Sequence, residues 1–179
     1  WVPDMGYGYG YPLFNYYPPL PFYLGELIHL LGISLIDSIK ILFILGLILS
    51  GIFAFLLGNQ LWGRHGGLVT AIFYVYAPYH AVDVFVRGAL NEFWALVLLP
   101  AVFWSMLKAI KESSKWVVVI AIFTSLLLLS HNIIALLALP AFIFFGLFFI
   151  WYYKKNWQAL FKLGIGSIWG LGLASFFTL

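Results

Sequence analysis

Long apolar runs alternate with short polar links along this chain of 179 residues. A helix that crosses about 30 Å of hydrocarbon needs roughly 20 residues, and several runs approach or reach that length. The pattern predicts an all-α polytopic membrane protein with about five transmembrane helices and a short interfacial helix. The predicted spans are 37–61, 66–82, 88–107, 116–130 and 133–153, followed by the start of a further, truncated span at 163–179.

The N-terminal residues do not fit a spanning helix, because their prolines and alternating glycines favour turns. We predict an outer loop at residues 1–19. Residues 20–32 are mostly apolar but place Glu26 and His29 three positions apart, which predicts a short interfacial helix. The chain opens on Trp1 and stops within an apolar run, so we interpret it as a fragment of one membrane domain.

The composition excludes several classes of protein. With 64% hydrophobic and 8% charged residues, the chain lacks the polar surface that a water-soluble domain needs. It contains no cysteine, which excludes disulfides, thiolate nucleophiles and thiolate metal sites. No Walker or Gly-x-Ser-x-Gly sequence occurs. We expect membrane lipid as a partner and no nucleic acid.

Lysines mark one side of the predicted membrane protein. The lysine-rich loops 108–115 and 154–162 are separated by two predicted spans, so they lie on the same side. The positive-inside rule makes that side cytoplasmic in a multi-pass protein of the cell membrane. The outer side then holds most of the acidic residues, namely Asp4, Glu26, Asp37, Asp83 and Glu92.

Polar residues gather in the outer segment "YAPYHAVDVFVRGALNEFWALVLLP", residues 76–100. His80, Asp83 and Arg87 are spaced i, i+3 and i+7, which places them on one helix face, with Asp83 and Arg87 forming an i, i+4 ion pair. In one interpretation the pair is structural and neutralises itself in a low-dielectric site. In the other, Arg87 binds an anion such as phosphate and Asp83 holds the guanidinium in place. The spacing alone does not separate the two.

Other polar residues carry similar alternatives. Glu92 lies near the start of a span, where a carboxylate interacts favourably with the helix dipole. His131 and Asn132 form either a turn between helices or part of an outward-facing cavity. We predict that residues 78–92 and 130–132 line this cavity, because two short spans leave their polar ends at depth on the same side. Tyr11 and Tyr16 suit a membrane-interface belt or contact with a sugar. We assign no metal site, because the candidate ligands lie on separate segments, and a divalent metal cofactor is left open.

Three segments resemble, in order, a large group of bacterial and archaeal membrane proteins. They are "GYGYPLFNYYPPLPFYLGELIHLLG", the 76–100 segment and "LLLLSHNIIALLALP". The group is labelled 6-pyruvoyl-tetrahydropterin-synthase-related, and it looks similar to the GT-C glycosyltransferases. The most specific elements are Arg-Gly-Ala-Leu-x-Glu and Ser-His-Asn. The pterin label implies little, because the soluble synthase of that name has a zinc-binding histidine set that this chain does not match.

The GT-C resemblance implies transfer of sugar from a polyprenyl-phosphate-linked donor at the outer membrane face. It implies that Arg87 binds the donor phosphate and that a carboxylate, Asp83 or Glu92, is catalytic. The remaining candidates for substrate binding are His80, His131, Asn132, Tyr11 and Tyr16. In such enzymes the first outer loop carries acidic residues, and this sequence begins inside that loop. The alternatives are a transporter or flippase for a polar or lipid-linked substrate, and a non-catalytic membrane subunit.

Overall fold

The computed structural model describes residues 2–178, and every regular element in this part of the chain is a helix. The predicted all-α class is therefore confirmed. An isolated antiparallel bridge joins Val2 to Tyr11 in the N-terminal segment. In chain order the elements are α1 (Leu13–Tyr16), α2 (Leu20–His29), α3 (Leu35–Val75), α4 (Pro78–Ala81), the π-helix η1 (Val82–Arg87), α5 (Leu90–Lys111), α6 (Trp116–Ser130), α7 (Asn132–Tyr152), α8 (Trp157–Leu173) and α9 (Ser175–Thr178).

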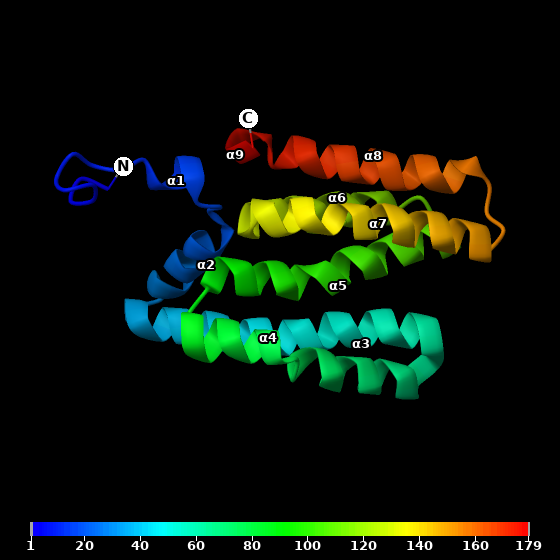
Figure 1. Ribbon diagram of the computed structural model, residues 1–179, viewed down its shortest axis with the longest axis horizontal. Helices are drawn as coiled ribbons and strands as arrows, with labels where there is room; N and C mark the ends of the chain where they lie inside the picture. The colour runs from blue at the N-terminus through cyan, green and yellow to red at the C-terminus, as the bar shows by residue number, and fades with distance from the viewer. Residues whose placement is uncertain (1, 179) are drawn as a thin grey trace.

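The longest element, α3, is a hairpin of two arms. Its backbone reverses at Gly63, whose φ of 75° and ψ of −176° are not helical. Figure 1 shows the second arm running back beside the first. Gly67 is buried between the arms, and a Cβ added there would lie 2.8 Å from the backbone oxygen of Phe55. Glycine at this position therefore allows the two backbones to approach closely.

Three helices, α3, α5 and α7, are long and apolar enough to cross a membrane. Helix α6 is also apolar, but its 15 residues extend only about 22 Å at about 1.5 Å per residue. Residues 2–178 therefore contain three candidate spans and one shorter apolar helix, as expected for a membrane protein. The finer prediction of about five spans remains a prediction. The first arm of α3 contains the predicted span 37–61, whereas the second arm ends at Val75 and contains only residues 66–75 of the predicted span 66–82. The rest of that predicted span belongs to the following turn, α4 and the first residue of η1.

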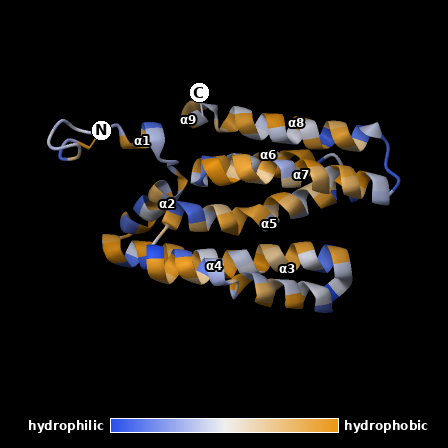
Figure 2. Ribbon diagram, in the orientation of Figure 1, coloured by the Kyte–Doolittle hydropathy of each residue, from blue (hydrophilic) through white to orange (hydrophobic). Residues whose placement is uncertain are grey.

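Helix α5 lies at the centre of the bundle, between the α3 hairpin and the layer formed by α6, α7 and α8 (Figure 1). In the most apolar stretch of α5, 72% of the residues are buried, whereas only 11% are buried in the corresponding stretch of α7. Hydrophobic residues predominate along α7, as the orange ribbon in Figure 2 shows, and many large hydrophobic side chains of α7 and α8 are exposed. An apolar face of this size is costly in water and suits contact with lipid.

The helix connections divide the charged residues between the two ends of the bundle. The reversal at Gly63 and the links 112–115 and 153–156 lie at one end, and residues 76–89 and 131 lie at the other, with α2 and the N-terminal segment (Figure 1). The lysine-rich loops 108–115 and 154–162 thus lie at the same end, as the alternation of the spans predicts. Most acidic residues lie at the opposite end, including Asp83 and Glu92.

Candidate functional site

The segment between α3 and α5 breaks regular α-helix at both of its ends. Pro78 begins α4 at the first helical position, where its missing N–H removes no hydrogen bond. The chain then widens into the π-helix η1, a geometry that occurs frequently at functional sites. Gly88 ends η1 with a φ of 58°, and the Ala89 N–H donates to the Asp83 carbonyl at 2.9 Å. This left-handed residue turns the chain into α5.

Four side chains from this segment and the start of α5 form one hydrogen-bonded group, which we name the Arg87 cluster: Tyr79, Asp83, Arg87 and Glu92. The Arg87 guanidinium donates from Nη1 to Asp83 Oδ1 at 2.9 Å and from Nη2 to Glu92 Oε2 at 2.7 Å. The Tyr79 hydroxyl donates to Glu92 Oε1. The predicted ion pair between Asp83 and Arg87 is present, and Glu92 extends it into a network.

The cluster contains two carboxylates and one guanidinium, so it carries a net charge of −1 when both acids are ionised. The Asp83 side chain is fully buried, whereas that of Arg87 is 47% exposed and that of Glu92 is 15% exposed. Burial and the neighbouring charge of Glu92 raise the pKa of Asp83, and Arg87 opposes this shift. Asp83 therefore anchors the guanidinium from inside, while part of Arg87 faces outward.

His80 is turned away from the charged groups and into the apolar core. It is 3% exposed, and its ring lies edge-on against the rings of Tyr74 and Phe93, at centroid distances of 4.9 Å and 5.9 Å. Its Nε2 and the Oδ2 of Asp83 are buried without a hydrogen-bond partner among the described residues. Unpartnered buried polar atoms are costly and mark sites where strain or an additional ligand is accommodated.

His131 and Asn132 lie at the junction of α6 and α7, at the same end of the bundle as the Arg87 cluster (Figure 1). His131 caps α7, because its Nδ1 accepts from the Ile134 N–H at 3.2 Å. The pKa of His131 is lowered, chiefly by burial and also by the charge of Arg87. The charge of Glu92 opposes this shift. Asn132 is exposed, and its Oδ1 accepts from the Ile133 N–H at 2.9 Å.

The N-terminal segment is attached beside the cluster through Asn91. Asn91 immediately precedes Glu92, and its Nδ2 donates to the Pro18 carbonyl at 2.7 Å. Tyr11 and Tyr16 stack on each other with ring centroids 5.5 Å apart. Neither tyrosine hydrogen-bonds to the Arg87 cluster in the part of the chain that the structure describes. The start of α5 thus contacts the N-terminal segment, whereas the two tyrosines predicted to bind substrate pack against each other.

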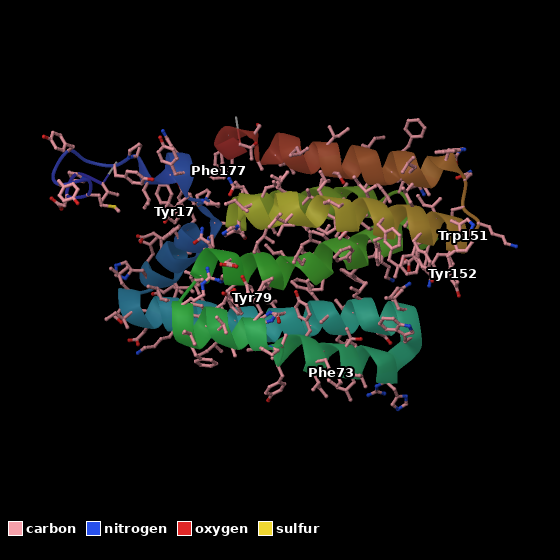
Figure 3. All side chains as sticks on the ribbon, viewed as in Figure 1. Tyr17, Phe73, Tyr79, Trp151, Tyr152 and Phe177 are labelled. Carbon is pink, nitrogen blue, oxygen red and sulfur yellow. The ribbon has the colours of Figure 1, made fainter. Side chains whose placement is uncertain are left out.

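Sequence reasoning missed two features of the site. Tyr79 was not a candidate, although it completes the group around Glu92, and Figure 3 shows it beside the start of α5. The contact between Arg87 and Glu92 was also missed, because helix dipole effects alone explain a glutamate near a helix start. The signal for the second feature was Gly88, since a glycine between Arg87 and Glu92 permits a left-handed turn that folds the two side chains together.

Metal ligands do not converge in the described residues, which contain no group of three or more His, Asp or Glu side chains able to hold an ion. The cavity along residues 78–92 and 130–132 remains a prediction, because the two cavities that the structure describes lie elsewhere. These have volumes of about 510 Å³ and 360 Å³, and both lie at the lysine-rich end of the bundle.

Comparisons with known proteins identify a family and one relative. A family model described as 6-pyruvoyl-tetrahydropterin synthase related domain, membrane protein, matches residues 14–179. An "Uncharacterized protein" of Lactococcus lactis subsp. cremoris (strain MG1363) is 27% identical over 185 residues. The match covers 98% of this chain and 30% of the relative, so the chain spans about a third of that protein's length. No solved structure matches.

Proposed function

Because the chain belongs to the 6-pyruvoyl-tetrahydropterin synthase related family of membrane proteins, we propose a function for its charged end within a membrane. The proposal is a GT-C-like glycosyltransferase that takes sugar from a polyprenyl-phosphate-linked donor at the outer membrane face. The lysine-rich loops 108–115 and 154–162 are then cytoplasmic. The observation that supports this function best is the Arg87 cluster, which places a guanidinium, a carboxylate and a tyrosine hydroxyl together at one end of the bundle.

Arg87 is suited to the donor phosphate. Its planar fork matches two phosphate oxygens, and Asp83 fixes it through Nη1 from the buried side. The hydrogen bond to Glu92 and that to Tyr79 raise the pKa of Arg87, so the guanidinium stays charged. Because the cluster already holds a net negative charge, an incoming phosphate must replace Glu92 on Nη2. Asp83 would remain in place during this exchange.

Glu92 is the group that the exchange releases. A carboxylate that loses its arginine partner becomes a stronger base. In the proposed reaction, Glu92 takes the proton of the acceptor hydroxyl, the acceptor oxygen bonds to the anomeric carbon, and the bond from that carbon to the phosphate oxygen breaks. The polyprenyl phosphate leaves with its charge held by Arg87. The neighbouring Asn91 links this residue to the N-terminal segment, where the acceptor or sugar would lie.

Substitution of Arg87 by Lys tests the phosphate role. Lysine keeps the positive charge but loses the fork, so we expect KM for a polyprenyl-phosphate sugar to rise about tenfold, the cost of roughly one charge-assisted hydrogen bond. The assay measures release of polyprenyl phosphate by the full-length protein in vesicles, together with the thermal unfolding midpoint. Lys40→Arg is the matched control, because Lys40 forms an exposed pair with Asp37 near the same end.

The outcomes separate the candidate functions. A tenfold rise in KM with an unchanged unfolding midpoint supports the phosphate site. An unchanged KM in the variant means that Arg87 serves only Asp83 and Glu92, and the phosphate role is then wrong. Movement of the lipid-linked sugar across the vesicle membrane, with the bond between sugar and phosphate intact, would instead indicate a flippase. A flippase is the second candidate because a π-helix and Pro78 interrupt the helices here, as in many transport pathways.

A further inference from the structure

A second charged site lies at the opposite end of the bundle from the Arg87 cluster. Lys154, Lys155 and Lys162 line an open cavity of about 360 Å³ between the end of α7 and the start of α8. Lys154 and Lys155 also line the adjoining cavity of about 510 Å³, together with Trp151 and Tyr152. The two cavities share Lys154 and Lys155, and we name the surface that lines both of them the lysine groove. None of the proposed catalytic residues belongs to it.

The lysines of this groove have no carboxylate partner among residues 2–178. The one acidic residue in the lining is Glu112, which is already bound by Lys108 Nζ at 2.6 Å and by Trp116 Nε1 at 3.0 Å. These two bonds lower the pKa of Glu112 and engage its charge. Three positive charges are therefore available to an anion in the groove.

The backbone at the end of α7 holds Lys154 in a conformation that usually requires glycine. The Lys155 N–H donates to the Ile150 carbonyl at 2.9 Å and the Lys154 N–H donates to the Trp151 carbonyl at 3.0 Å. These are the two bonds of a Schellman ending, in which glycine is the common residue at the position that Lys154 occupies. Lys154 takes a φ of 50° there. A lysine at such a position is retained against local strain, which favours a functional role for its side chain.

The helix dipole explains only part of this arrangement. Cations are favourable at the C-terminal end of a helix, so Lys154 and Lys155 stabilise the end of α7. Lys162 lies instead in the second turn of α8, where the dipole gives no stabilisation to a positive charge. It nevertheless lines the same groove. A shared anionic ligand accounts for all three positions.

The surroundings indicate that this anion belongs to a lipid. Trp151 and Trp157 are 73% and 76% exposed beside the groove, and Figure 3 shows Trp151 and Tyr152 projecting at this end of α7. Exposed tryptophan and tyrosine are typical of the membrane–water interface. The outer face of α7 continues from here with exposed Phe144 and Phe148, where acyl chains can lie. We propose that the lysine groove binds the phosphate headgroup of an anionic phospholipid.

The test compares lipid retention by the full-length protein in native mass spectrometry. The probes are phosphatidylglycerol and phosphatidylcholine of the same chain length, with inorganic phosphate as a soluble competitor. We expect preferential retention of phosphatidylglycerol, and a loss of about fivefold in its affinity in each of Lys154→Gly and Lys162→Ala, from the contribution of one lysine near a membrane surface. Lys115→Ala is the matched control, because Lys115 is at the same end but does not line the groove.

Lys154→Gly makes the test independent of folding. Glycine suits the left-handed turn, so this variant is expected to unfold at an equal or higher temperature while it binds less phosphatidylglycerol. Three results would overturn the proposal: equal retention of the two lipids by the wild type, an unchanged affinity in both groove variants, or displacement of the lipid by inorganic phosphate at an equal concentration. A loss in Lys115→Ala as large as in the groove variants would equally reject a localised site.

Discussion

Replacement of Glu92 by Gln is expected to lower the rate of sugar transfer by about 10²- to 10⁴-fold, the usual contribution of a general base. Glutamine is close to the same size and its oxygen can still accept from the Tyr79 hydroxyl, so the packing of α5 is retained. It cannot take a proton from an acceptor hydroxyl. The measurement is the initial rate of polyprenyl phosphate release at saturating donor, with the unfolding midpoint measured on the same protein.

The control for this prediction is Glu112→Gln. Like Glu92, Glu112 accepts hydrogen bonds from one cationic side chain and one aromatic side chain, here Lys108 and Trp116. Because it lies at the lysine-rich end of the bundle, loss of its charge is expected to change the transfer rate less than twofold. If Glu92→Gln transfers sugar at the wild-type rate, Glu92 is not the base. If both variants lose the same activity, the effect is one of general electrostatics and not of catalysis at the Arg87 cluster.

In the proposed reaction, the release of Glu92 from Arg87 gives the cluster two states. Without donor, Arg87 holds Asp83 and Glu92 together, and the exposed part of the guanidinium is stabilised by both acids. With donor phosphate bound, the proposal has Arg87 keep Asp83 and release Glu92. Asp83 can serve as the constant partner because it is fully buried and lies within the π-helix, whereas Glu92 lies in the first turn of a different helix, α5. The two acids are thus suited to different tasks by their positions.

The sequence predicted well those features that depend on periodicity. The alternation of apolar runs and polar links gave the all-α class and placed 108–115 and 154–162 at the same end of the bundle, because each span reverses the direction of the chain. The i, i+4 spacing of Asp83 and Arg87 gave their ion pair. These inferences need only the local helix geometry, which the sequence determines directly.

The sequence did not predict features that depend on how segments turn toward each other. The expected shared face of His80, Asp83 and Arg87 holds only for the last two, because His80 packs between Tyr74 and Phe93 in the core. The π-helix η1 and the left-handed Gly88 change the direction of successive side chains, and an ideal α-helical spacing does not represent them. The partner of Arg87 in α5 followed from this turn and not from any spacing rule.

The hairpin of α3 is a second feature that the sequence predicted only in part. The polar link around Gly63 marked a break between two spans, but the closeness of the two arms was not evident from sequence. It follows from the glycines that face each other: a Cβ on Gly58 would lie 3.0 Å from the Cα of Gly67. Small residues at a helix contact permit such an approach, and only the structure shows which of the seventeen glycines are used in this way.

Replacement of Gly67 by Leu is expected to be the most destabilising of the changes considered, by about 3 kcal/mol or more, the upper range for overpacking a close contact. A Cβ at this position lies 2.8 Å from the Phe55 carbonyl oxygen and 2.9 Å from the Asn59 nitrogen. Both are backbone atoms, so no side-chain rotation relieves the clash. The measurement is unfolding of the purified protein in mixed micelles by a denaturing detergent, followed by circular dichroism.

The matched control is Gly172→Leu in α8, where nothing lies within 4 Å of an added Cβ. Leucine has a higher helix propensity than glycine by about 0.8 kcal/mol, so the control is expected to be neutral or slightly more stable. Equal stability of the two variants would show that the arms of α3 do not approach as closely as Gly67 indicates. The second arm of α3 leads directly into α4 and η1, so separation of the arms displaces Asp83 and Arg87 from Glu92. Gly67→Leu is therefore also expected to lower the proposed sugar transfer, although the atoms nearest to an added Cβ at Gly67 belong to Phe55 and Asn59 and not to the cluster.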